Sequence, residues 1–143
     1  MSRAPVPVAP DAAAVVVMLL RSLLAGRADR VAEKVQVSTE MGRNPEGGPP
    51  SLPWVLVRDD GGRWEWPAVA SALVRLSVWH HNERSAKALC TLALTLLACH
   101  EGGGGLIVVD ALALPAAGTD PYTGAPLATA SCTAFLRAGF VDR

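Results

Sequence analysis

Histidine and cysteine residues gather in one stretch of the chain, which is the first place to look for metal or nucleophilic chemistry. His80 and His81 are adjacent, and Cys90, Cys99 and His100 follow. Adjacent residues at the end of a strand point to opposite faces, so the two histidines do not converge on one ion. Cys90 and Cys99 are nine positions apart on one expected helix, which puts them about half a turn out of phase. The spacing predicts no metal site and no cofactor, only two exposed histidines that lead into a helix.

The remaining chemical motifs are equally weak. There is no GxSxG motif and no Ser, His and Asp set at a recognisable catalytic spacing. Asp59 and Asp60 precede Gly61 and Gly62, and aspartate is favoured in turns for its local hydrogen bonds. The four glycines at 102–105 lack the Gly-Lys-Ser/Thr and the helix that complete a phosphate-binding loop. The sequence therefore favours a protein that is not an enzyme.

Two tryptophans carry a stronger signal, for contact with another protein. Trp64 and Trp66 occupy alternate positions beside Arg58 and Arg63, and residues two apart on a strand share a face. Tryptophan and arginine are enriched at the energetic centres of interfaces. We expect these four residues to form an interface patch. The alternative is that one or both tryptophans fold onto the core. The further candidate interface residues are Met41, Arg43, Asn44 and Trp79.

Composition supports association with proteins and argues against nucleic acid or membrane as the partner. The 143 residues include 50% hydrophobic and only 18% charged residues, and 13 basic residues balance 13 acidic ones. A neutral chain lacks the basic excess that neutralises phosphates, and zero net charge favours association. The longest apolar run covers nine residues, 12–20, whereas a membrane-spanning helix needs about 20.

The order of the expected elements predicts the fold class. Hydrophobic periodicity and capping residues predict helices at 12–24, capped by Asp11, and from Asn82 to about residue 100. Strands are expected at 31–37, 54–58, 73–79, 106–114 and 127–137. An extended leader is expected at 1–10, a Pro/Gly-rich loop at 38–53 and another loop at 115–126. A hairpin turn is expected at 59–62, with its return arm at 63–67. This order predicts one α+β domain over 1–143. It would have a mixed or antiparallel sheet, two helices packed on one face, and an extended hairpin.

Several of these segments resemble the tail terminator proteins of long-tailed bacteriophages. The apolar helix at 11–24 precedes a strand and a Pro/Gly-rich loop, as it does in that family. Residues 52–58 (LPWVLVR) are similar to a family strand, and residues 73–79 (LVRLSVW) run into a helix opening at 81–86 (HNERSA) in a similar way. Residues 120–126 (DPYTGAP) also resemble a segment of actinophage members. The resemblance covers roughly residues 11–138.

This resemblance implies a fold and a role. Family members are α+β domains that form a six-fold ring in the virion, at the head-proximal end of the tail, after assembly in the host cytoplasm. The ring caps the tail tube, ends its growth and joins it to the head connector, while DNA passes through the central hole without sequence-specific binding. The implied partners are therefore further copies of this chain, most simply as a hexamer, the tail tube protein and head-tail connector proteins, with no membrane.

Two other interpretations stay open. Other head-tail connector proteins, the stoppers and adaptors, share the size and the order of elements, so the chain could occupy a neighbouring position in the connector. A monomeric binding module that uses the tryptophan hairpin, or a small hydrolase that uses His80, His81 or Cys90, is a less favoured alternative.

Overall fold

The computed structural model describes residues 4–45, 47–110 and 112–142. Residues 1–3 of the expected leader, residue 46 of the expected loop and residue 111 of the expected strand at 106–114 lie outside the described residues.

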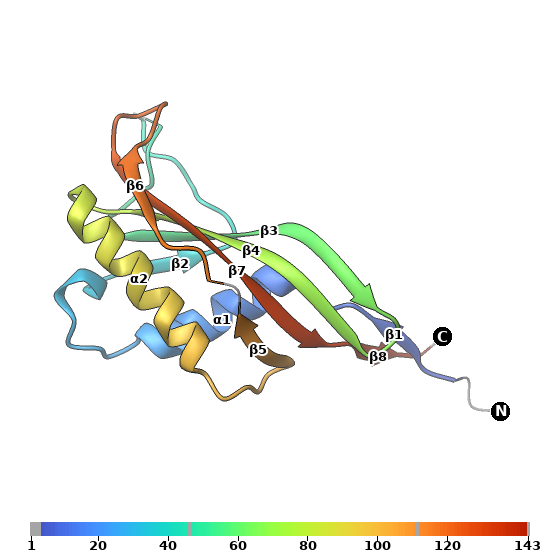
Figure 1. Ribbon diagram of the computed structural model, residues 1–143. Coiled ribbons are helices and arrows are strands. Elements are labelled where there is room, and N and C mark those ends of the chain that lie inside the picture. Colours follow the sequence, from blue (N-terminus) through green and yellow to red (C-terminus); the bar gives the residue numbers. More distant parts are fainter. Residues whose placement is uncertain (1–3, 46, 111, 143) are drawn as a thin grey trace.

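One mixed sheet organises the fold (Figure 1). The strands are β1 (Val6–Val8), β2 (Gln36–Ser38), β3 (Trp54–Glu65), β4 (Val69–Trp79), β5 (Leu106–Asp110), β6 (Ala116–Thr119), β7 (Pro126–Arg137) and β8 (Gly139–Val141). The main sheet has the order β2-β3-β4-β7-β5, and β6 also pairs with β7. β2 runs parallel to β3, and the other pairings among the described residues are antiparallel. β1 and β8 form a separate two-stranded sheet.

Two helices, α1 (Ala12–Leu24) and α2 (Glu83–Cys99), cover one face of the main sheet, and a short 3-10 helix, η1 (Arg30–Ala32), precedes β2. Both helices begin at the residues expected from the sequence. The carboxylate of Asp11 accepts a hydrogen bond from the Ala14 N–H at 3.1 Å, and the amide oxygen of Asn82 accepts one from Ser85 at 2.8 Å. The expected α+β class, with a mixed sheet and two helices on one face, is confirmed.

The core lies between the helices and alternate residues of the three central strands. These residues are Val55 and Val57 of β3, Val74, Leu76 and Val78 of β4, and Ala128, Ala130, Cys132, Ala134 and Leu136 of β7. The alternation expected for β7 is thus confirmed, and its small side chains let α2 lie close to the sheet. Among residues 4–45, 47–110 and 112–142, no helix lies on the opposite face.

The expected hairpin turn at 59–62 is wrong. β3 continues through these residues to Glu65, and the turn lies at 66–68. The step from Asp59 to Gly62 on β3 spans three residues, whereas the step between their partners Val74 and Ala72 on β4 spans two. One extra residue on β3 is a β-bulge. Gly62 allows this close approach, because a Cβ there would lie 2.8 Å from the Cα of Ala72.

Other boundaries also differ from the sequence prediction. The strand expected at 106–114 ends at Asp110, and the strand expected at 73–79 begins at Val69. Residues 31–37 divide into part of η1 and β2, with Lys34 between them at a positive φ of 58°. The expected loop at 115–126 contains β6, which forms a hairpin with β7. The leader contributes β1, which pairs with the unpredicted β8. These strands of three or four residues are too short for a periodic pattern to be detected.

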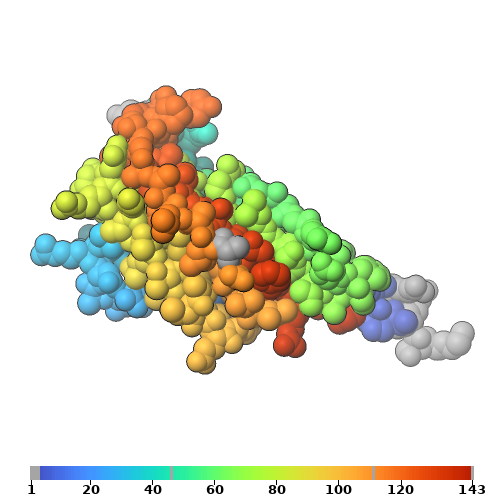
Figure 2. All heavy atoms as spheres, in the orientation of Figure 1, coloured from blue at the N-terminus to red at the C-terminus, as the bar shows by residue number. Residues whose placement is uncertain are grey.

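The molecule tapers from a broad body to a narrow end. Figure 2 shows the helices and loops at the broad end and the distal parts of β3 and β4 at the narrow end, close to β1 and β8. Within the described residues, no helix is both long and apolar enough to cross a membrane.

Candidate interaction surface

The distal end of the β3–β4 hairpin forms an exposed projection, which we call the arm and define as residues 58–68. Every residue of the arm is exposed. By contrast, Val55 and Val57, earlier in β3, have no accessible surface. The backbone ladder to β4 continues to the pair Glu65 and Val69. The arm is therefore regular in backbone structure while its side chains face solvent.

Trp64 and Trp66 lie together on the arm, as the sequence predicts. Their ring centroids are 5.0 Å apart with the planes tilted by 58°. Trp64 is opposite Ala70, on the side of the sheet that carries the helices, and its indole N–H donates to the Pro67 carbonyl at 3.2 Å. It is 39% exposed, whereas Trp66, in the turn after β3, is 66% exposed. Trp64 thus leans on the body, and Trp66 projects from it.

The arginines lie on the other face of the arm. Arg58 is directly opposite Arg75, and Asp60 sits 3.3 Å from the Arg75 guanidinium. Arg63 immediately precedes Trp64, so strand alternation points the two side chains to opposite faces. The expectation that Arg58 and Arg63 flank the tryptophans on one patch is therefore wrong. Glu65 lies 3.7 Å from the Arg63 guanidinium, so the arm has an apolar face and a face that carries charges of both signs.

The loop after β2 holds three further candidates. Arg43 is exposed, while Met41 and Asn44 are partly buried. The Asn44 side chain accepts a hydrogen bond from the Gly48 N–H at 3.0 Å and donates one to the Pro49 carbonyl at 3.3 Å. Asn44 is thus a structural residue of the loop. The contact of this loop with a partner stays a prediction.

Trp79 is not on an accessible surface, which corrects its place among the candidates. It is 6% exposed, and its indole N–H donates to the Asp120 carboxylate at 3.1 Å. Asp120 is 8% exposed and also accepts from the Tyr122 N–H at 2.9 Å. Burial raises the pKa of Asp120, but hydrogen bonds from Tyr122, Trp79 and Thr123 lower it, and the resulting pKa lies below its ordinary value. This pair fastens the β6–β7 turn to the end of β4.

His80 is buried, whereas the sequence predicts two exposed histidines. It is 6% exposed, and its Nδ1 accepts from the His81 N–H at 2.8 Å. Nε2 therefore carries the proton and donates to the Val31 carbonyl at 2.9 Å. The Nε2 bond joins the end of β4 to η1 and the Nδ1 bond is local, so both ring nitrogens have structural partners. His81 is exposed, as expected.

The buried thiols are poorly suited to nucleophilic chemistry. Burial, together with the neighbouring Cys132, raises the pKa of Cys90 to about 12, and burial raises the pKa of Cys132 to about 11. The thiolate is the nucleophilic form, so neither group is activated near neutral pH. In the part of the chain that the structure describes, no three His, Cys, Asp or Glu residues lie close enough together to hold a metal ion.

The β1–β8 sheet adds apolar surface that the sequence did not reveal. Val8 is 40% exposed, Phe140 61% and Val141 52%. The N–H of Ala138, just before β8, donates to the Ala68 carbonyl in the arm at 2.8 Å. The narrow end of the molecule therefore combines the arm with both terminal strands.

The chain matches no protein-family model and no curated protein.

Proposed function

We propose that this chain is a structural ring protein of a phage tail, a tail terminator that caps the tail tube, ends its growth and joins it to the head connector. The observation that carries this proposal is the arm, an exposed projection with two tryptophans in contact. A subunit of an assembly can place such a projection on its neighbour. The resemblance of residues 11–138 to the terminator family is consistent with this use of the arm.

The distribution of exposed apolar side chains favours assembly. Trp64, Trp66, Phe140 and Val141 are all exposed near the narrow end, and Met18 is 71% exposed on α1, in the body. Two different apolar regions on one chain suit a heterologous contact, in which one patch meets a different patch on the next copy. Such contacts close into a ring when the rotation between copies allows it.

The chemistry of the best nucleophile and base candidates supports a role other than catalysis. Cys90 and Cys132 have raised pKa values, and both ring nitrogens of His80 are held by backbone groups. A hydrolase that used Cys90 or His80 would need that group to be activated and accessible.

Ring formation tests the proposal. The purified full chain, alone and with polymerised tail tube protein from the same genome, is examined by light scattering after size-exclusion chromatography and by negative-stain electron microscopy. We expect rings with a central hole, most simply of six copies, either free or seated on one end of the tube. A chain that stays monomeric and leaves the tube ends bare would refute the proposal.

A matched pair of variants ties ring formation to the arm. Trp66→Ala removes the projecting aromatic of the arm, and Tyr122→Ala removes an aromatic that is 90% exposed in the β6–β7 turn, away from the arm. We expect Trp66→Ala to abolish rings and Tyr122→Ala to preserve them. Equal effects of the two variants would contradict the role given to the arm.

A further inference from the structure

The helix-free face of the main sheet is covered at one end by loop segments. Trp54 is opposite Trp79 in the β3–β4 register. Their neighbours Val55 and Val78 belong to the core on the helix side, so Trp54, Trp79 and also Leu56 point to the helix-free face. Leu56 is nevertheless only 8% exposed and Trp79 only 6% exposed. Another part of the chain therefore lies over them.

Residues 47–53, which we call the lid, meet the β6–β7 turn at this end of the sheet. Gly48, Pro49 and Pro53 of the lid are buried. A Cβ at Gly47 would lie 3.6 Å from Cγ2 of Thr123 in the turn. Figure 1 shows the loop after β2 and the β6–β7 turn beside each other at the broad end of the molecule. The lid and the turn are therefore the cover of this end of the helix-free face.

The hydrogen bonds of the lid leave it free to move as a unit. The N–H of Gly47 donates to the Asn44 carbonyl at 2.9 Å, and the N–H of Gly48 donates to the Asn44 side chain at 3.0 Å. These bonds stay within the loop, and the three prolines of the lid have no backbone N–H to donate. The Pro53 carbonyl accepts from the Gln36 N–H at 3.2 Å, which fastens the end of the lid to β2. The lid can thus lift from the turn while it keeps these bonds.

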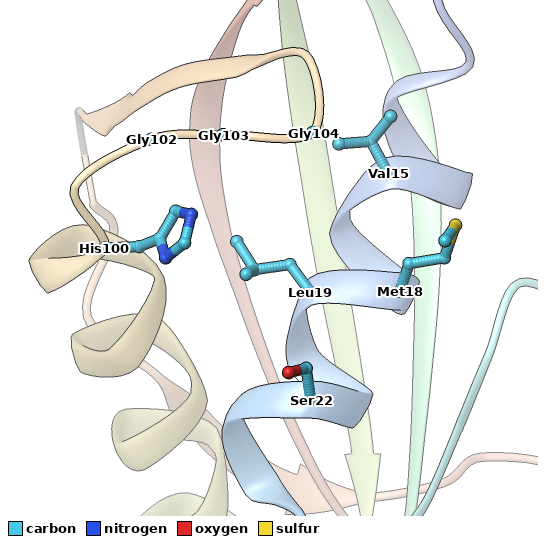
Figure 3. Close-up of a pocket in the computed structure, with 8 residues that line it drawn as sticks. All are labelled: Val15, Met18, Leu19, Ser22, His100, Gly102, Gly103 and Gly104. Carbon is cyan, nitrogen blue, oxygen red and sulfur yellow. The ribbon is translucent and has the colours of Figure 1, made fainter.

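The indole N–H of Trp54 is buried and unpaired beneath this cover. Among the described residues it is the one buried side-chain polar atom without a hydrogen-bond partner. The imidazole of His100, by contrast, borders an open groove beside α1 where water reaches it (Figure 3). The indole of Trp79 is also provided for, because it donates to Asp120 at 3.1 Å. A buried donor has lost its hydration, so one without a partner raises the free energy of the closed state.

We propose that the lid is closed in the free chain and lifts when copies of the chain join, and that the unpaired N–H of Trp54 keeps the open state within reach. Lifting the lid hydrates this N–H and uncovers the apolar side chains of Trp54 and Leu56. The closed lid shields this apolar surface from premature association. This inference rests on the proposed function, because it assigns a regulatory step to the same assembly.

Two matched tryptophan variants test the role of the unpaired donor. Trp54→Phe and Trp79→Phe remove the same atoms from opposite residues, but the first removes an unpaired N–H and the second breaks the bond to Asp120. Hydrogen exchange of the full chain, read by mass spectrometry, compares peptides that contain the lid and the turn. We expect exchange to be about tenfold slower in Trp54→Phe than in Trp79→Phe. Equal rates, or faster exchange in Trp54→Phe, would show that Trp54 has a partner in the closed chain and would overturn the proposal.

A disulfide between the lid and the turn tests the lifting itself. Gly47→Cys and Thr123→Cys place two thiols within disulfide reach. The chain also carries Cys99→Ser, because Cys99 is the exposed native thiol. Ring formation is measured by light scattering and negative-stain electron microscopy, alone and with polymerised tail tube protein, before and after reduction. The reduced form controls for the strain of a side chain at Gly47, whose φ is 90°.

We expect rings from the reduced protein and none from the oxidised protein. If the reduced variant forms no rings by itself, it is added at one part in ten to the Cys99→Ser chain. Its disulfide should then form more slowly in the mixed rings than in the free chain, and equal rates would overturn the proposal.

The outcomes separate this inference from the proposed function. Equal ring formation by the oxidised and reduced proteins would leave the proposed function standing and refute the lid. A Cys99→Ser chain that never forms rings or caps a tube would refute the terminator role and, with it, the coupling of the lid to assembly.

Discussion

Replacing Asp120 with asparagine should weaken the fold by removing one of the bonds that fasten the β6–β7 turn. One carboxylate oxygen accepts from the Trp79 indole at 3.1 Å, and the other accepts from the Tyr122 N–H at 2.9 Å. Asparagine has a single acceptor oxygen, and its other terminal group is a donor. In either orientation, an NH₂ group would therefore face one of these two N–H donors.

The size of the effect follows from the buried, charged character of the site. A hydrogen bond to a charged group contributes about 1.5–3 kcal/mol, and a buried donor left unpaired costs about 1–3 kcal/mol. With Asp120 only 8% exposed, we expect Asp120→Asn to lower the free energy of unfolding by about 2–3 kcal/mol. The control is Asp60→Asn, which breaks the exposed 3.3 Å ion pair with Arg75 and should cost no more than about 1 kcal/mol.

The same carboxylate predicts a pH dependence. The pKa of Asp120 is lower in the folded chain than its ordinary value. Its stabilising contribution is therefore fully present above that ordinary value, near about 3.9, and is lost as the pH falls through the lower folded value. Asp120→Asn should lose less stability than the wild type over this acidic window.

Urea unfolding followed by tryptophan fluorescence, from pH 7 down to pH 3, measures both effects. We expect a lower midpoint for Asp120→Asn at pH 7 and convergence with the wild type as the pH falls. An unchanged midpoint at pH 7, or parallel acid profiles for the two proteins, would show that Asp120 is not the bonded anion described above.

Two further predictions concern the bulge and the thiols. Gly62→Ala should destabilise the arm by about 1–3 kcal/mol, because its Cβ would meet the backbone of β4. The control is Gly118→Ala, whose Cβ would meet nothing within 4 Å and which should be nearly neutral. Hydrogen exchange of the arm amides compares the two variants, and equal protection in both would contradict the close approach. Cys99 should react with a thiol reagent in the native protein at pH 8, while the buried Cys90 and Cys132 should react only after unfolding. Fast reaction of all three thiols in the native protein would refute the burial of Cys90 and Cys132.

Helices and long strands were predictable because their signals are local and repeated. Asp11 and Asn82 each provide a side-chain acceptor at a helix start, and the alternation of β7 persists over 12 residues. In such segments the periodicity and the burial of one face reinforce each other. The fold class followed from the order of these elements.

The arm was mispredicted because two physical effects share one sequence signal. Asp-Asp-Gly-Gly is a good hairpin turn by composition, but here Asp59 and Gly62 keep their pairing with β4 on either side of an extra residue. Gly62 permits a close backbone approach to β4, and the strand continues instead of reversing. Arg63 and Trp64 are adjacent on β3, so strand alternation alone places their side chains on opposite faces.

The buried polar residues were missed for a different reason. Trp79 and His80 look like exposed residues at the end of a strand, but their partners Asp120 and Val31 lie 41 and 49 positions away. Such pairs become visible only when the sheet brings β6, η1 and the end of β4 together. No local pattern distinguishes a buried His80 from an exposed His81.

The apolar character of α1 was visible in the sequence, but its meaning depended on the fold. Val16 and Leu20 are fully buried against the sheet, whereas Met18 is 71% exposed and Val15 and Leu19 are half-buried beside the glycine segment. A helix that is apolar on both sides must be covered on both sides to be stable in water. The sheet covers one side of α1, and under the proposed ring assembly a neighbouring subunit would cover the other.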